Sequence, residues 1–200
     1  MVTVIKPMIA ILASYCLGSF SSAIMVCRLM GLPDPRSQGS TNPGATNVLR
    51  YGGKKAAVLT LAGDMAKGII PVFVAKYDGF SVITLSLVVL AAFLGHLYPV
   101  FFKFQGGKGV ATAAGCLLAL YWPLGLVLLL TWLIIAILFR YSSLAALVTT
   151  VLAPVYTWYL TNSTYTVTVC IMSILLIYRH WHNIKNLISG QERKIGAHRL

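Results

Sequence analysis

The chain of 200 residues is too hydrophobic and too poor in charge for an ordinary soluble domain: hydrophobic residues make up 58% of it and charged residues 10%, against about 45–50% and about 25% in soluble domains. This composition also excludes a disordered chain and a disulfide-bonded scaffold, and it predicts an all-α integral membrane protein with several spans. The sixteen Lys and Arg residues outnumber four Asp and Glu residues, for a net charge of +12, and so few acids exclude a two-metal site or a pair of catalytic carboxylates.

Seven apolar segments are predicted to be the membrane-spanning helices of one membrane domain, residues 1–200. In chain order they are residues 7–27, 56–75, 80–97, 108–121, 123–139, 143–160 and 164–179. A helix of about 20 residues crosses the hydrocarbon core of a bilayer. Residues 28–55, between the first two spans, are crowded with Gly, Pro, Ser, Thr and Asn and are predicted to be irregular backbone.

The apolar stretch 110–139 is divided into two spans at Trp122-Pro123. As one helix its thirty residues would be about 45 Å long, against a hydrocarbon core of about 30 Å. Only two spans place Arg140 and the C-terminal tail on the same side as the earlier basic loops. The N-terminus then lies outside and the C-terminus in the cytoplasm, with thirteen of the sixteen basic residues, Arg199 among them, on the cytoplasmic side. Because topology explains the basic excess, we expect no nucleic acid partner.

Four polar segments fall on the predicted cytoplasmic face. Each carries Lys or Arg together with glycines, hydroxyls or histidines: residues 39–50, 106–109, 140–143 and 179–183. Gly-rich backbone lets N–H groups approach an anion, and hydroxyl, Lys and Arg side chains complete a phosphate site. Membrane anchors and flexible turns would explain any one segment, but they explain the four together less well. The sequence therefore predicts a phosphate-binding active site on the cytoplasmic face.

The same polar segments, in the same order, resemble the motifs of a known family. GSTNPGATNVLR at 39–50, GDMAKG at 63–68, GHLYPVFFKFQGGKGVAT at 95–112, RYSSLAA at 140–146 and RHWHNIKNLISGQERKIG at 179–196 are similar to those of the bacterial PlsY-type glycerol-3-phosphate acyltransferases. The resemblance implies a seven-helix enzyme of the bacterial inner membrane that transfers an acyl group from acyl phosphate to the 1-hydroxyl of glycerol 3-phosphate. The products would be phosphate and 1-acyl-glycerol 3-phosphate (lysophosphatidic acid), the first lipid intermediate of phospholipid synthesis. We expect membrane lipids around it, and no cofactor, metal or obligatory protein partner.

Chemistry and resemblance together assign roles to the polar residues. The predicted catalytic residues are Ser40, Arg50, Lys108, Ser143, His180 and Asn183, and the predicted substrate-binding residues are Gly39, Asn42, Thr46, Asn47, Gly106, Gly107 and Gly109. Arg50 can grip a phosphate with two donors, and Lys108 supplies a point charge among glycines; either could instead anchor the chain at the membrane interface. Ser142 departs from the family's pattern, so the functional serine is Ser142 or Ser143, and the spacing to Leu144 favours Ser143.

His180 is open to more than one interpretation. It can bind phosphate or hold its loop, while the acyl phosphate accepts the proton of the attacking hydroxyl. It can instead be the general base, or simply an interfacial histidine. We favour the binding role, because an acyl phosphate brings its own proton acceptor and leaving group. No covalent acyl-enzyme is expected, since no Ser or Cys lies beside an evident base.

Asp64 and Lys67 lie at helical spacing inside the second span. An ionisable pair inside a membrane suggests function by default, but we favour a neutralised pair that holds the bundle together and could orient the Gly-rich loops. A small organophosphate or anion transporter is the rival function, and it predicts polar residues near the middle of several spans and often inverted repeats. A membrane scaffold would not need the glycines. Because only this pair lies in the middle of a span, the enzyme is the favoured function.

Overall fold

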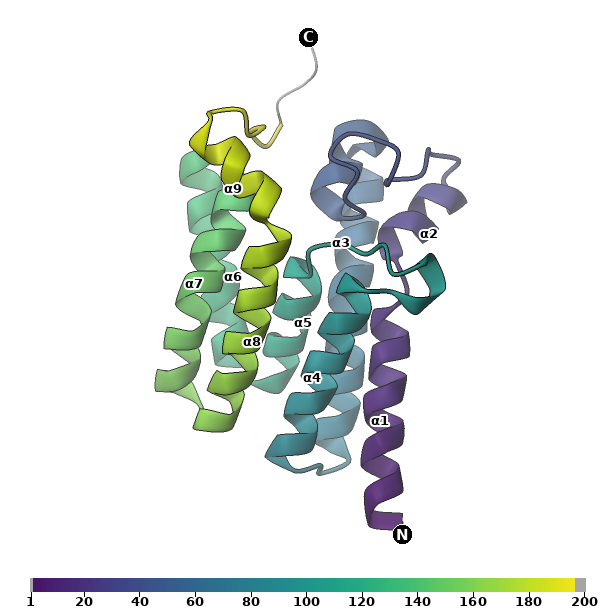
Figure 1. The fold of residues 1–200 in the computed structure, drawn as a ribbon, viewed down its shortest axis with the longest axis vertical. Coiled ribbons are helices and arrows are strands. Elements are labelled where there is room, and N and C mark those ends of the chain that lie inside the picture. Colours follow the sequence, from purple (N-terminus) through teal and green to yellow (C-terminus); the bar gives the residue numbers. More distant parts are fainter. Residues whose placement is uncertain (1, 197–200) are drawn as a thin grey trace.

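A computed structural model describes residues 2–196, which form helices joined by loops and contain no strand (Figure 1). This agrees with the all-α prediction. The elements are α1 (Val2–Gly18), α2 (Ser22–Leu29), α3 (Ala45–Tyr77), α4 (Val82–Leu97), the 3₁₀ helix η1 (Val100–Phe102), α5 (Val110–Leu120), α6 (Trp122–Phe139), α7 (Ser142–Leu160), α8 (Ser163–Arg179) and α9 (Trp181–Ile188). Met1 and residues 197–200, among them Arg199, lie outside the described residues.

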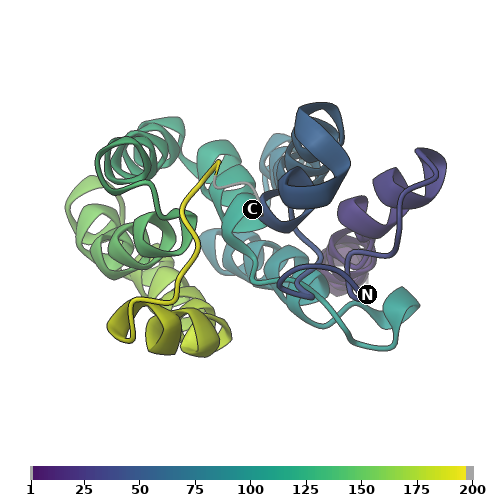
Figure 2. The same ribbon diagram turned by 90° about the horizontal axis from the view of Figure 1, so that it is seen from above.

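Helix α5 lies between two groups of helices (Figure 2). Helices α1 to α4 pack together on one side of it, and α6, α7 and α8 on the other. Helix α5 contacts α3 and α4 in the first group and α6 in the second. The loop before α3, the loop before α5 and helix α9 lie toward the end of the molecule opposite the N-terminus (Figure 1). The polar segments that were predicted to share one face therefore do gather at one end.

The predicted division of residues 110–139 into two helices is confirmed. Helix α5 ends at Leu120, Tyr121 has extended backbone, and α6 begins at Trp122 with Pro123 in its first turn. Proline favours the first turn of a helix because its missing N–H has no intrahelical acceptor there. The predicted span 108–121 is thus shortened to α5, whose 11 residues rise only about 16 Å.

The predicted first span, residues 7–27, is wrong as a single helix. The chain bends by 45° between α1 and α2. Ser21 caps α2, because its side-chain oxygen accepts a hydrogen bond from the backbone N–H of Ile24 at 3.5 Å. A serine that satisfies an N–H in this way starts a new helix, so the apolar run continues while the helix direction changes.

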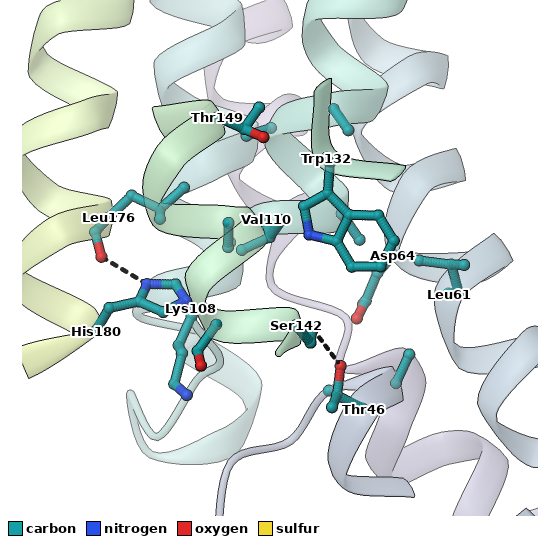
Figure 3. A pocket seen from close by; sticks show the side chains of 18 of the residues that line it. Thr46, Leu61, Asp64, Lys108, Val110, Trp132, Ser142, Thr149, Leu176 and His180 are labelled. Atoms are coloured by element: carbon teal, nitrogen blue, oxygen red, sulfur yellow. Dashed lines mark hydrogen bonds between the residues drawn. The ribbon is translucent and has the colours of Figure 1, made fainter. Parts of the chain in front are cut away.

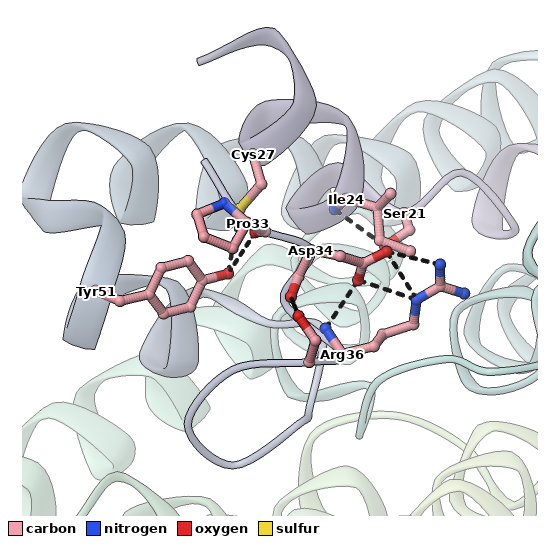
Figure 4. Close-up of polar contacts among 8 residues, drawn as sticks. Ser21, Ile24, Cys27, Pro33, Asp34, Arg36 and Tyr51 are labelled. Atoms are coloured by element: carbon pink, nitrogen blue, oxygen red, sulfur yellow. Dashed lines mark hydrogen bonds and ion pairs between the residues drawn. The ribbon is translucent and has the colours of Figure 1, made fainter. Parts of the chain in front are cut away.

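Residues 28–55 are only partly irregular, which corrects a second prediction. Helix α3 begins at Ala45, well before the first residue of the predicted span 56–75, and continues to Tyr77. Gly53 interrupts it with φ 79° and ψ 178°, a backbone conformation that glycine adopts without steric cost. The loop before α3 is closed by short-range bonds (Figure 4): Arg36 pairs with Asp34 at 2.7 Å, and the Tyr51 hydroxyl donates to the carbonyl of Pro33 at 3.4 Å.

Four of the described helical segments are long and apolar enough to cross a membrane, or five if the bent pair α1 and α2 counts as one span. These four are α3, α4 with η1, α6 and α7. Helices α5 and α8 are apolar but shorter, with 11 and 17 residues. The structure therefore supports several spans, whereas the full count of seven and the orientation stay predictions.

Small residues let the central helices approach closely. A Cβ on Gly68 of α3 would collide with the carbonyl of Thr112 in α5, and a Cβ on Gly115 of α5 would collide with the carbonyl of Met65 in α3. Glycines at such crossings are typical of helix pairs inside membranes. The tight contact places the first turn of α5 beside α3, where the polar segments meet.

Candidate active site

A cavity of about 550 Å³ lies among α3, α5, α6, α7 and α8, with the segment after α9 at its edge. In Figure 3 the side chains of Lys108, His180, Ser142 and Thr46 lie toward one end of this cavity, and those of Trp132 and Thr149 toward the other. Deeper in the bundle the lining is largely apolar, with Leu117, Leu128, Val169 and Met172 among its residues. One cavity thus joins a polar, cationic end to an apolar interior.

The six residues predicted to be catalytic come together around this cavity. Its lining includes Ser40, Arg50, Lys108, Ser143, His180 and Asn183. Four of the seven predicted substrate-binding residues also line it, namely Asn42, Thr46, Asn47 and Gly109. Gly39, Gly106 and Gly107 are not among the lining residues, so the structure brings them near the site but not into contact with the cavity.

A chain of hydrogen bonds connects four polar residues at the cationic end. The Lys108 ammonium donates to the side-chain oxygen of Asn183, whose amide donates to Glu192 at 2.8 Å. The Ser143 hydroxyl donates to the same carboxylate oxygen at 2.7 Å. Glu192 therefore ties the start of α7 to α9 and, through Asn183, to the loop before α5.

Glu192 also bears on the prediction that no covalent acyl-enzyme forms. We expected no serine beside an evident base, yet Ser143 lies within hydrogen-bonding distance of this carboxylate. The two candidate serines differ in their partners as well: Ser142 shares a 3.0 Å hydrogen bond with Thr46, and only Ser143 is buried. Both line the cavity.

His180 is buried at the junction of α8 and α9. Its Nδ1 lies 2.8 Å from the backbone carbonyl of Leu176 (Figure 3). A carbonyl can only accept, so Nδ1 carries the proton and Nε2 of the neutral ring keeps a lone pair. Burial, and after it the positive charge of Lys108, lowers the pKa of His180 to about 4. The ring is therefore neutral at pH 7, with Nε2 free to accept a hydrogen bond.

Lys108 is the cation in the Gly-rich loop, residues 106–109, which precedes α5. Burial lowers its pKa to about 8, and Glu192 opposes this shift while Arg50 and Arg179 add to it. Desolvation disfavours the charged amine, and neighbouring cations do the same. Lys108 is consequently charged for the most part at pH 7 but loses its charge as the pH rises through about 8.

The first turns of α3, α5 and α7 line the cavity, and these helices begin without a side-chain cap. Gly44 precedes α3, Gly109 precedes α5 and Tyr141 precedes α7, and none of the three starts has a side-chain hydrogen bond to its N–H groups. The first N–H groups of a helix have no acceptor inside the helix and carry partial positive charge. Such helix ends are suited to bind anions, and here they lie close to Lys108 and Arg50.

Asn47 organises the loop before α3. Its side-chain oxygen accepts from the N–H of Ser40 at 2.9 Å, and its amide donates to the carbonyls of Pro35 and Gln38, each at 2.9 Å. These bonds use both of its amide hydrogens, so Asn47, which was predicted to bind substrate, has its side-chain donors occupied by its own loop. Gly39 has φ 57°, and a Cβ there would collide with the side-chain oxygen of Asn47.

The predicted pair of Asp64 and Lys67 has a third member. The Lys67 ammonium lies 2.8 Å from the Asp64 carboxylate, and Nδ1 of His96 in α4 lies 3.6 Å from the same oxygen. Lys67 also donates to the carbonyl of Phe20, between α1 and α2. The ring of His96 packs directly against Gly107. The cluster thus connects three helical regions with the Gly-rich loop, as the interpretation of a bundle-holding pair anticipated.

The predicted catalytic and substrate-binding residues did not include Glu192, Arg179 or His96, although Arg179 begins the predicted polar segment 179–183. Each is placed by contacts with residues far away in the chain, and no spacing pattern near it signals the contact. Within residues 2–196, no group of three His, Cys, Asp or Glu side chains is arranged to hold a metal ion. The groups available to an anion are therefore cations, hydroxyls and backbone N–H groups.

Comparison with known proteins places this geometry in a family. The family model of glycerol-3-phosphate acyltransferases matches residues 8–190. The glycerol-3-phosphate acyltransferase of Methylococcus capsulatus is 57% identical over 188 residues, which cover 94% of this chain and 95% of the relative. That of Shewanella loihica is 54% identical over 185 residues, covering 92% and 91%.

Solved structures agree with the sequence relatives. A crystal structure of PlsY (YgiH), an integral membrane glycerol 3-phosphate acyltransferase, in its glycerol 3-phosphate form has a TM-score of 0.91 and 39% identity, with 96% of each chain covered. The lysophosphatidic acid form has a TM-score of 0.88 and 38% identity, with the same coverage. The chain is therefore a multi-pass membrane protein that belongs to the PlsY-type glycerol-3-phosphate acyltransferase family.

Proposed function

We propose that the protein transfers an acyl group from acyl phosphate to the 1-hydroxyl of glycerol 3-phosphate, at the cytoplasmic face of the bacterial inner membrane. The observation that carries the proposal is the single cavity of about 550 Å³ that is cationic at one end and apolar inside. Both substrates bear a phosphate, and one bears a long apolar chain. The solved relatives in glycerol 3-phosphate and lysophosphatidic acid forms support the same acceptor and product for this chain.

The cationic end supplies the phosphate-binding groups. Arg50 offers a planar pair of donors and Lys108 a point charge, while the uncapped start of α5 offers backbone N–H groups. Such preorganised donors neutralise the charge that grows on the leaving phosphate. The apolar lining, with Leu117 and Val169 on it, receives the acyl chain, because burial of each CH₂ group is favourable by about 0.8 kcal/mol.

The proposed reaction is a direct transfer. The 1-hydroxyl oxygen of glycerol 3-phosphate attacks the carbonyl carbon of the acyl phosphate and forms the ester bond. The bond between that carbon and the phosphate oxygen breaks, and the hydroxyl proton leaves with the phosphate. Holding the two substrates in line is the main task of the protein.

The structure of the His180 environment supports the phosphate, and not the imidazole, as the proton acceptor. With a pKa of about 4, His180 is a weaker base than a phosphate monoester, whose second pKa is about 6. Its Nε2 lone pair orients glycerol 3-phosphate by accepting a hydrogen bond from the 2-hydroxyl, which leaves the proton of the attacking 1-hydroxyl for the phosphate. Ser143 and Glu192 are assigned to positioning of α7 and Asn183, since a serine hydroxyl beside a carboxylate has no strong base to activate it.

The function is tested with purified protein in lipid nanodiscs, supplied with palmitoyl phosphate and glycerol 3-phosphate and with no thioester donor. We expect lysophosphatidic acid and inorganic phosphate in equal amounts. Arg50→Lys, which keeps the charge but loses the paired donors, should lose most turnover, while Arg28→Lys on the exposed surface of α2 should keep it. Product formation only with acyl thioesters would overturn the proposed donor.

The proton acceptor is tested by His180→Asn, which keeps hydrogen-bonding capacity, beside His180→Ala. If His180 only orients glycerol 3-phosphate, the Asn variant should retain more activity than the Ala variant and the pH profile should survive. A general base would make both variants equally slow, by about 10²–10⁴-fold, and would remove a titration from the rate profile. That result would make this a histidine-catalysed transferase.

A further inference from the structure

Arg179, the last residue of α8, forms hydrogen bonds to the Gly-rich loop from outside the cavity. One of its terminal nitrogens donates to the carbonyl of Gly106 at 2.7 Å and to that of Gly107 at 2.9 Å, and its Nε donates to the carbonyl of Gly107 at 3.1 Å. Arg179 is not among the residues that line the cavity, whereas Lys108 and Gly109 are. Its guanidinium therefore reaches the site only through the loop backbone.

The opposite side of the loop is fixed by the end of α4. The N–H of Gly107 donates to the carbonyl of His96 at 3.2 Å, and a Cβ on Gly106 or Gly107 would collide with His96. The guanidinium of Arg179 also lies over the ring of Tyr98, 5.7 Å from its centroid, in the range of a cation–π contact. The loop is thus held between His96 on one side and Arg179 on the other.

The geometry of the peptide bond between Gly107 and Lys108 determines where the N–H group of Lys108 points. In a trans peptide the C=O and the N–H point to opposite sides, and the described residues contain no cis bond. The carbonyl of Gly107 points at Arg179, so the N–H of Lys108 points away from it. Among the described residues, the N–H groups of Lys108 and Gly109 have no backbone or side-chain acceptor, and the first turn of α5 that follows has no side-chain cap.

We propose that Arg179 is a positioning residue, which fixes the two glycine carbonyls on the outer side of the loop so that the N–H groups from Lys108 to Val110 face a phosphate in the cavity. The inference deepens the proposed function, because it assigns the backbone of this loop to the phosphate of a substrate. Consecutive N–H groups beside a residue of positive φ, here Gly109 at 91°, form a concave anion site.

The geometry distinguishes this role from a purely electrostatic one. If Arg179 only added positive charge near the phosphate, Lys at the same position would serve as well. A lysine ammonium is a compact point charge and lacks the planar array of donors that bonds both carbonyls at once. Arg179→Lys therefore separates the two roles, with Arg179→Gln as the variant that loses both the charge and the array.

The kinetic test measures kcat and KM with palmitoyl phosphate and glycerol 3-phosphate for the wild type, Arg179→Lys, Arg179→Gln and the control Arg28→Lys. If the N–H groups from Lys108 to Val110 are misplaced, kcat/KM should fall by about 10²-fold in both Arg179 variants, and inorganic phosphate should inhibit them more weakly. The control should not change. Near-native kcat/KM in Arg179→Lys would overturn the positioning role. A wild type that is inactive in the same assay would instead overturn the proposed function.

A measurement on the wild type keeps the test decisive if the variants do not fold. Residue-resolved amide hydrogen exchange is followed in nanodiscs with and without inorganic phosphate. Phosphate should slow exchange at Lys108 and Gly109, and leave Gly107 unchanged because its N–H is already bonded to His96. Protection of Gly107 but not of Lys108, or no protection in this segment, would contradict the proposed direction of the N–H groups.

Discussion

Helices whose first turns line the cavity begin differently from helices whose first turns lie elsewhere. Helices α2, α4 and α8 are capped by Ser21, Ser81 and Asn162, whose side chains accept hydrogen bonds from the first turn. Helices α3, α5 and α7 line the cavity with their first turns and have no such cap. Helices α6 and α9 have no cap either: the first turn of α6 contains Pro123, which has no N–H to satisfy, and α9 follows α8 directly at His180.

The difference shows how stability and binding are divided within one bundle. A cap stabilises a helix by about 1 kcal/mol because it gives an acceptor to an unpaired N–H. Where the cap is missing, the N–H groups stay available to an anion, and the partial positive charge of the helix end remains exposed to it. In this protein the uncapped ends of α3, α5 and α7 coincide with the cationic end of the cavity, so side-chain caps are missing where we propose that phosphate binds.

Removal of the cation beside an uncapped end should have the largest effect. Lys108→Ala takes away the charge next to the start of α5, and we expect a loss of about 10²–10³-fold in kcat, as for other preorganised charge-stabilising donors. Steady-state kinetics in nanodiscs measure it. Lys55→Ala is the matched control, because this exposed lysine lies on α3 outside the cavity lining. Equal activity of both variants would break the link between the cavity and phosphate.

The pH dependence should reveal the same cation. Lys108 is charged below its pKa of about 8 and neutral above it, so the KM for a phosphate substrate should rise as the pH increases through about 8. The expected slope is about tenfold per pH unit once the neutral form prevails. In Lys108→Arg, whose guanidinium stays charged, this alkaline limb should move to higher pH. An unchanged limb in that variant would assign the titration to another group.

Serines at an uncapped and at a capped helix start should respond in opposite ways. Ser143→Ala removes the bond to Glu192 and should lower kcat/KM about tenfold, because a hydrogen bond to a charged group contributes about 1.5–3 kcal/mol. Ser81→Ala removes the cap of α4 and should lower the free energy of unfolding by about 1 kcal/mol with unchanged kcat. Thermal unfolding and kinetics on both variants test the pair. A comparable loss of activity in Ser81→Ala would remove the distinction.

Ser142→Ala should have the smallest effect. It breaks a neutral hydrogen bond to Thr46, which contributes only about 0.5–1.5 kcal/mol and lies at the exposed edge of the site. Because water replaces the lost partner at this exposed edge, we expect the lower end of this range, a change of about twofold in kcat/KM. A loss larger than that of Ser143→Ala would identify Ser142 as the functional serine.

Local patterns were sufficient to predict which polar residues gather around one cavity. The six residues predicted to be catalytic all line this cavity. They could be predicted because each stands in a short motif of glycines, hydroxyls and cations. The break at Trp122-Pro123 was equally local. Composition alone predicted the all-α membrane fold, which the helices and the family confirm.

Features that depend on distant contacts could not be predicted in this way. Glu192 meets Ser143 across 49 positions of sequence, and Arg179 meets Gly107 across 72. Asn47 looks like a donor for substrate in the sequence, yet its partners are carbonyls of its own loop. Ser21, which caps α2 at the bend in the first span, is a residue type that favours a helix start. The apolar residues on both sides of it nevertheless favoured one continuous helix.

The most direct test of the account is a structure of the protein with a non-hydrolysable acyl phosphonate bound. The account predicts the phosphonate oxygens within hydrogen-bonding distance of the Lys108 side chain and of the N–H groups of Lys108 and Gly109, with the acyl chain in the cavity beside Leu117 and Val169. A phosphonate bound away from the start of α5, or an acyl chain outside the cavity, would contradict it.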